Sequence, residues 1–170
     1  MSGTAFVLSR LASPLGAILL VSDGERLRAL DFEDYEARMQ RLLARHYGEV
    51  TLQPGRDASG AADALTAYFD GQLDALDALS VATGGSEFQR RVWAMLRTIP
   101  TGTTTTYGAL ARRLDRPTAS RAVGLANGAN PISIVVPCHR VVGANGSLTG
   151  YAGGLDRKRW LLRHEGVAAR

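Results

Sequence analysis

The single cysteine of this 170-residue chain, Cys138, lies in the segment Val136-Pro137-Cys138-His139-Arg140. A thiol is a nucleophile only as thiolate, and an adjacent imidazole or cationic side chain favours that form. One cysteine allows neither an internal disulfide nor a four-thiolate zinc site. Two interpretations remain, an inert thiol buried as a small apolar group or a lone reactive thiol. The neighbours His139 and Arg140 favour the reactive thiol.

Charge is divided unevenly along the chain. Residues 1–85 carry seven Arg and twelve Asp or Glu, a net charge of −5, whereas residues 86–170 carry thirteen Lys or Arg and four Asp or Glu, a net charge of +9. The basic half indicates a surface for a polyanion, although a solvated face without a partner is the alternative. The sequence has no apolar run of about 20 residues, so we expect no membrane association. The lone thiol and the absence of a targeting segment predict a cytoplasmic protein.

The first half of the chain predicts a small α+β domain, residues 1–85. Its short apolar runs, separated by turn residues, are typical of strands in one antiparallel three-stranded sheet. Two further segments place apolar residues at helical spacing. The expected strands cover 6–11, 15–22 and 27–32, and the expected helices cover 34–47 and 61–69.

The second half, residues 86–170, predicts a helical domain around Cys138. Ser86 is a typical N-cap residue, and the second and third helices are separated by a short turn, as in helix-turn-helix proteins. The β-branched run 132–136 predicts a strand that leads directly to the cysteine. The expected helices cover 86–99, 106–114, 118–128 (with Ser120 as an alternative start) and 155–165. We therefore expect an α+β protein whose C-terminal domain has a helix-turn-helix (winged-helix-like) fold.

The expected third helix, 118–128, has almost only small side chains. Gly124 within it costs about 1 kcal/mol relative to alanine, which suggests close approach of another body. Arg121 is its only long polar side chain, so the helix suits contact with a DNA groove and backbone more than reading of bases. The alternative is tight packing against the expected strand 132–136, and both can hold on opposite faces.

At this point several motifs resemble the O6-alkylguanine-DNA alkyltransferases, also called methylated-DNA–protein-cysteine methyltransferases, in their bacterial constitutive form. The resemblance is dense over residues 86–166 and sparse before them. The matching motifs are Phe88-Gln89-Arg90-Arg91-Val92-Trp93, Ile99-Pro100-Thr101-Gly102, Thr106-Tyr107, Arg121-Ala122-Val123-Gly124, Asn130-Pro131, Pro137-Cys138-His139-Arg140-Val141, Gly150-Tyr151 and Leu161-Leu162-Arg163-His164-Glu165-Gly166.

The resemblance implies direct reversal of DNA alkylation damage. A monomer would bind duplex DNA that contains O6-alkylguanine, and by extension O4-alkylthymine, and rotate the damaged nucleotide out of the base stack. Cys138 would then accept the alkyl group irreversibly. Because the chain has no second cysteine to remove that group, we expect one turnover per molecule and no cofactor.

The resemblance also implies roles for particular residues. His139 would take the proton of Cys138 through a water molecule, and Glu165 would orient that histidine. Tyr107 would donate a proton to the departing base, and Asn130 would connect the DNA-binding helix to the active-site segment. The expected DNA contacts are Arg121, which would fill the gap left by the flipped nucleotide, with Thr106, Ala119, Ser120, Ala122, Ala126 and Asn127. The expected base pocket is formed by Val141, Tyr151, Ala152 and Gly153.

The sequence departs from the family pattern at two places. Some members bind zinc in the N-terminal half, but here that half has no cysteine and only His46, so we expect no metal. Ala152 stands where some members carry serine, which leaves a backbone N–H as the donor to the guanine oxygen.

Two other functions remain open from the sequence. A cysteine hydrolase would use Cys138, His139 and Glu165 with repeated turnover, and a non-catalytic DNA damage sensor would bind without reacting. Sensors of this kind lack the acceptor thiol, so the presence of Cys138 argues against the second.

Overall fold

The computed structural model describes residues 3–168 and divides the chain into two compact units. The first comprises residues 1–85 together with 131–135, and the second comprises 86–130 and 136–170. The expected boundary after residue 85 coincides with one junction. The short segment 131–135, by contrast, packs with the first unit although the sequence analysis assigned it to the second.

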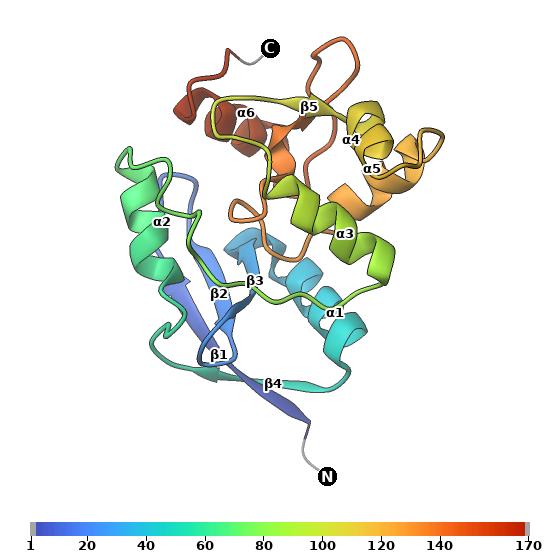
Figure 1. The fold of residues 1–170 in the computed structure, drawn as a ribbon. Helices are drawn as coiled ribbons and strands as arrows, with labels where there is room; N and C mark the ends of the chain where they lie inside the picture. Colours follow the sequence, from blue (N-terminus) through green and yellow to red (C-terminus); the bar gives the residue numbers. More distant parts are fainter. Residues whose placement is uncertain (1–2, 169–170) are drawn as a thin grey trace. The chain divides into compact units, whose positions relative to one another are not determined.

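The first unit is built on a four-stranded sheet in the order β3-β2-β1-β4 (Figure 1). Strands β1, β2 and β3 form the expected antiparallel meander, whereas β4 pairs in parallel with β1. The expected count of three strands was therefore wrong. The bounds are β1 Thr4–Leu11, β2 Ile18–Ser22, β3 Leu27–Phe32 and β4 Val50–Pro54.

Helices complete the first unit. A 3-10 turn, η1 (Glu33–Tyr35), leads into α1 (Glu36–Tyr47), which packs on β3. The helix α2 (Ala61–Phe69) confirms the expected range. A buried apolar cluster joins α1 to the sheet because both present one apolar face. Its members are Phe6, Leu19, Val21, Ala29, Met39 and Leu43.

The segment 131–135 is a tight turn at the edge of β3, not the expected strand. Leu30 donates its N–H to the Pro131 carbonyl at 3.0 Å and accepts from the Ser133 N–H at 3.1 Å. Ile134 has a φ of 71°, in the left-handed region that β-branched residues rarely adopt. Its side chain is nonetheless fully buried, so the apolar run that suggested a strand serves as a buried turn.

The second unit contains the helix-turn-helix arrangement. Helices α3 (Glu87–Leu96) and α4 (Tyr107–Arg113) both pack on α5 (Ser120–Gly128). The indole N–H of Trp93 in α3 donates to the Ala126 carbonyl in α5 at 2.8 Å, which satisfies a buried donor and fixes the two helices together.

The remaining elements of the second unit surround the cysteine. A two-stranded parallel sheet joins β5 (Thr105–Thr106) to β6 (Val141–Val142), directly after the 3-10 turn η2 (Cys138–Arg140). Helix α6 (Leu155–His164) contacts η2. The cysteine thus lies in a turn between a helix-turn-helix and a closing helix.

Candidate active site

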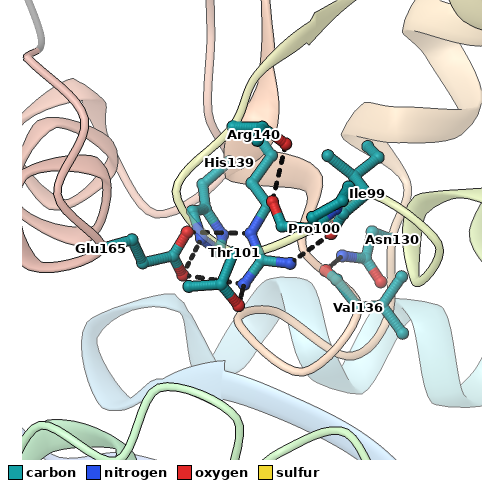
Figure 2. Close-up of polar contacts among 9 residues, drawn as sticks. Ile99, Pro100, Thr101, Asn130, Val136, His139, Arg140 and Glu165 are labelled. Atoms are coloured by element: carbon teal, nitrogen blue, oxygen red, sulfur yellow. Dashed lines mark hydrogen bonds and ion pairs between the residues drawn. The ribbon is translucent and has the colours of Figure 1, made fainter.

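The side chains of His139 and Arg140 converge on the carboxylate of Glu165 (Figure 2). His139 Nε2 lies 2.8 Å from Glu165 Oε2, and Arg140 Nε lies 2.8 Å from Glu165 Oε1. A second guanidinium nitrogen, Nη2, donates to Oε2 at 3.0 Å. All three side chains are buried, so one carboxylate receives three hydrogen bonds in a place where an unpaired charge would be very costly.

Arg140 also ties this cluster to the loop after α3. Its Nη1 donates to the Ile99 carbonyl at 2.7 Å, and Nη2 reaches Thr101 Oγ1 at 3.2 Å (Figure 2). The planar guanidinium can satisfy a carboxylate and a carbonyl at once, which a lysine ammonium cannot match in geometry. The Ile99-Pro100-Thr101 loop, η2 and the end of α6 are therefore held by one side chain.

The electrostatics of the His139–Glu165 pair decide which ring nitrogen of His139 carries the proton. Burial alone would raise the pKa of Glu165, but the hydrogen bonds from His139 and Arg140 and the positive charge of Arg140 outweigh it and hold the pKa well below its ordinary value. Burial lowers the pKa of His139 below 6.5, against the opposing effect of Glu165. An ionised carboxylate only accepts hydrogen bonds. His139 is therefore neutral near pH 7, with its proton on Nε2 and a lone pair on Nδ1.

Cys138 is buried at the start of η2, with 3% of its surface exposed. Two asparagines of the helix-turn-helix segment hold its backbone. Asn130 donates from Nδ2 to the Val136 carbonyl at 2.7 Å, and Asn127 donates from Nδ2 to the Cys138 carbonyl at 3.4 Å. The Asn130 contact runs from the end of the helix-turn-helix to the segment before the cysteine, and Cys138 and His139 lie in the turn η2, after the range 132–136 in which a strand was expected.

Lys158 of α6 is a buried cation close to the cysteine. Its Nζ donates to the Val141 carbonyl at 2.6 Å and to the Thr149 carbonyl at 3.2 Å. Burial lowers the pKa of Lys158 to about 8, against a smaller opposing influence of Cys138. The cation therefore fixes two backbone carbonyls, and its electrostatic coupling to Cys138 favours a negative charge on the thiol.

Tyr107 is the first residue of α4. Hydrogen bonds hold both the start of this helix and the tyrosine hydroxyl. The preceding Thr106 caps the helix, because its Oγ1 accepts the Ala109 N–H at 3.1 Å. The phenol hydroxyl lies 2.7 Å from Thr149 Oγ1. A side-chain carbon built at Gly124 would lie 3.7 Å from the Tyr107 ring, so that glycine of α5 faces the tyrosine.

The exposed face of α5 includes only some of the expected DNA contacts. Ser120, Arg121 and Ala122 are exposed, whereas Ala126 and Asn127 are buried and support the protein interior. Thr106 and Ala119 are half-buried. Leu125, which the sequence analysis did not select, is 73% exposed one turn after Arg121. The exposed surface of this helix is thus one arginine among small or apolar side chains.

The expected pocket residues lie after the cysteine in the chain. Val141 is buried in β6, Tyr151 and Ala152 are half-buried, and Gly153 is buried. The sequence analysis missed Arg140, Lys158 and Thr149 as partners of the site. Arg140 had a signal, since it follows His139 directly, whereas the contacts of Lys158 and Thr149 join segments that no sequence spacing connects.

Two observations bear on other kinds of site. Within residues 3–168 we find no group of three or more His, Cys, Asp or Glu side chains placed to hold a metal ion. In the same range, every helix is too short or too polar to cross a membrane.

Both halves of the chain match models of one protein family. Residues 87–167 match the 6-O-methylguanine DNA methyltransferase DNA-binding domain, and residues 7–83 match the ribonuclease-like domain of the same enzymes. A methylated-DNA–protein-cysteine methyltransferase from Salmonella typhimurium is 55% identical over 160 residues, which cover 92% of this chain and 94% of that protein. One from Methanosarcina acetivorans is 48% identical over 154 residues, or 91% and 94% of the two chains.

Solved structures agree with these relatives. The Mycobacterium tuberculosis OGT in complex with DNA has a TM-score of 0.79 at 44% identity and covers 94% of this chain and 92% of its own. The O6-methylguanine-DNA methyltransferase of the archaeon Pyrococcus kodakaraensis has a TM-score of 0.75 at 26% identity, covering 95% and 99%. The α+β fold with a helical DNA-binding domain is confirmed, and this chain belongs to the methylated-DNA–protein-cysteine methyltransferase family.

Proposed function

We propose that this protein repairs alkylated DNA by moving the alkyl group of O6-alkylguanine, and of O4-alkylthymine, onto Cys138. The observation that carries the proposal is the buried Cys138 in the same turn as a histidine whose proton is fixed on Nε2 by Glu165. The family relationship supplies the substrate class. Duplex DNA containing the damaged base is the partner, the protein acts as a monomer in the cytoplasm, and no cofactor takes part.

The geometry supports a division of labour between neighbouring residues. Glu165 holds His139 so that the Nδ1 lone pair is left to take the thiol proton through a water molecule. The thiolate sulfur attacks the alkyl carbon, the carbon–oxygen bond breaks, and its electrons pass to the guanine. Tyr107 donates a proton to the base as this charge develops. The product is a thioether on Cys138 and an unmodified guanine.

DNA binding is assigned to residues 86–170, and residues 1–85 support them. The exposed Arg121 of α5 fills the space left by the flipped nucleotide, and Ser120 and Ala122 contact the DNA around it. Asn130 transmits the position of α5 to the cysteine turn through its contact with the Val136 carbonyl. Val141, Tyr151, Ala152 and Gly153 line the base pocket.

The first test is the intact mass of the protein after mixing with duplex DNA that contains O6-methylguanine. We expect a gain of one methyl group per chain that never exceeds one and that is absent in Cys138→Ala. An unchanged mass with bound DNA would instead identify a damage sensor. An unchanged mass with repeated release of methanol would identify a hydrolase.

The role of Arg121 has its own test. We expect Arg121→Ala to slow repair more than it weakens binding to undamaged duplex, because a gap-filling side chain acts only after flipping. Arg112→Ala, which removes an exposed arginine of α4 instead, is the matched control for loss of charge. Equal repair rates for Arg121→Ala and the unsubstituted protein would remove Arg121 from the flipping step.

A further inference from the structure

We infer that Thr149 is a positioning residue for the proton donor Tyr107, an inference that rests on the proposed function. The two hydroxyl oxygens lie 2.7 Å apart, the length of a good hydrogen bond between hydroxyls. Thr149 lies in the loop between β6 and α6, and 42 residues separate it from Tyr107 in the chain. The contact therefore joins two parts of the second unit at the hydroxyl group on which the chemistry of Tyr107 depends.

The direction of the Thr149 hydroxyl is set by the packing of its methyl group. A side-chain carbon built at Gly143 would come within 3.3 Å of Thr149 Cγ2 and 2.8 Å of Ser147 Oγ. The methyl group therefore lies beside the space that a side chain at position 143 would occupy, and the glycine leaves that space to it. Because a threonine side chain has one rotatable bond to place both groups, seating the methyl group aims the hydroxyl.

The backbone of Thr149 is held separately. Lys158 Nζ donates to its carbonyl at 3.2 Å and to the Val141 carbonyl at 2.6 Å. The same buried cation thus fixes the loop and the strand that carries a pocket residue. Thr149 is constrained at its carbonyl, its methyl group and its hydroxyl, whereas a loop residue that serves only as a turn needs none of these contacts.

Tyr107 is confined from its other side by α5. Its ring faces Gly124, where an added side-chain carbon would meet it at 3.7 and 3.9 Å. These are ordinary contact distances, so the ring rests on the helix without a clash. With the ring against Gly124 and the oxygen on Thr149, the phenol is directed before any DNA arrives.

Proton transfer from Tyr107 to the guanine determines which of the two hydroxyls donates the hydrogen bond. In the free protein either hydroxyl can donate. When Tyr107 gives its proton to the departing guanine, the phenol oxygen carries negative charge, and only Thr149 can then donate across the contact. The Thr149 proton stays on its own oxygen and stabilises the phenolate, so the hydrogen bond is stronger after proton transfer than before it. Thr149 therefore both aims the donor and favours its ionisation.

The test is a double-mutant cycle on the rate of methyl transfer from O6-methylguanine duplex to Cys138. Thr149→Val keeps the shape and removes the hydroxyl, and we expect it to slow transfer about tenfold, the effect of one hydrogen bond made stronger in the transition state. Thr149→Ser keeps the hydroxyl but loses the methyl group that aims it, so it should restore part of the rate. In a Tyr107→Phe background, Thr149→Val should cause no further slowing, because the partner oxygen is already absent.

Three outcomes would overturn the inference. Thr149→Val could react as fast as the unsubstituted protein, it could slow the Tyr107→Phe protein by the same factor, or Thr149→Ser could be as slow as Thr149→Val. The second would show that the residue acts through loop structure alone, and the third would show that the hydroxyl by itself does not support the reaction. An unsubstituted protein that transfers no methyl group would remove the proposed function and this inference with it, so the two failures are distinguishable.

Discussion

At the scale of single residues, the protonation of His139 is set by its surroundings before any substrate binds. Glu165 is kept ionised by Arg140 and His139, and an ionised carboxylate demands a donor at Nε2. Burial at the same time disfavours a second proton on the ring. The result is a neutral imidazole with a lone pair on Nδ1, which is the state that a base for a thiol requires.

This state predicts how the transfer rate depends on pH. The pKa of His139 is lowered below 6.5. The pH must therefore fall below 6.5 before the imidazole becomes protonated and can no longer act as a base. We expect the rate of methyl transfer in single-turnover assays to hold through pH 6.5 and to fall only below it. His139→Gln should be slower by about 100-fold and lack this limb. A midpoint above pH 6.5 would contradict the assignment of His139 as the base.

The second prediction at this scale concerns Arg140. Its guanidinium satisfies Glu165, the Ile99 carbonyl and Thr101 together, which no lysine rotamer can do. We expect Arg140→Lys to lower the free energy of unfolding by about 2 kcal/mol in urea titrations. The control Arg163→Lys, at an exposed arginine of α6, should change it by less than about 0.5 kcal/mol. Similar losses for both variants would show that the buried network is not stabilising.

At the scale of elements, the start of α3 is specified by a local signal. Ser86 Oγ accepts the Gln89 N–H at 3.1 Å, and Gln89 Oε1 accepts the Ser86 N–H at 3.0 Å, a complete capping box. We expect Ser86→Ala to lower the free energy of unfolding by about 1 kcal/mol, whereas Ser86→Asp, which keeps an acceptor, should lose less. Thermal unfolding of the unsubstituted protein and the two variants tests this prediction. Equal melting temperatures would mean that the capping box does not stabilise the protein.

Local signals of this kind explain which elements could be predicted. The helix 61–69 and the strand 27–32 were confirmed because their apolar spacing and flanking turn residues lie within one segment of chain. The strand β4 was missed because its residues pair in parallel with β1, far away in sequence. The run 132–136 was wrong as a strand because its residues 132–135 are buried in a turn at the edge of β3, and apolar composition alone does not distinguish the two.

The candidate site shows the same limit. Cys138, His139 and Glu165 could be selected because their types carry the chemistry and the family motifs include them, and the structure places His139 on Glu165. Thr149 and Lys158 could not, because their importance lies in contacts across loops that no sequence spacing reveals. Asn127 was expected on the DNA side, but its position on the helix turns it toward the Cys138 carbonyl.

At the scale of the whole molecule, the reactive thiol is part of the folded interior. Cys138 is 3% exposed, and its neighbours Val136, Val141 and His139 are buried as well. Helices on either side in the sequence contribute to its surroundings, with asparagines from the end of α5 and Lys158 from α6. A covalent change at this sulfur is therefore also a change in core packing, so repair and stability are linked.

This linkage predicts that the repaired protein is less stable than the unreacted one. A methyl group added to a closely packed interior costs about 2 kcal/mol, because neighbours must shift or leave their preferred rotamers. For a chain of this size that corresponds to a fall of about 5 °C in the melting temperature. The measurement is thermal unfolding before and after reaction with O6-methylguanine duplex, once the DNA has been removed. Cys138→Ala carried through the same procedure should keep its melting temperature. Equal temperatures for the methylated and unmethylated protein would show that the site has room for the product, and that alkylation does not mark the spent molecule through its fold.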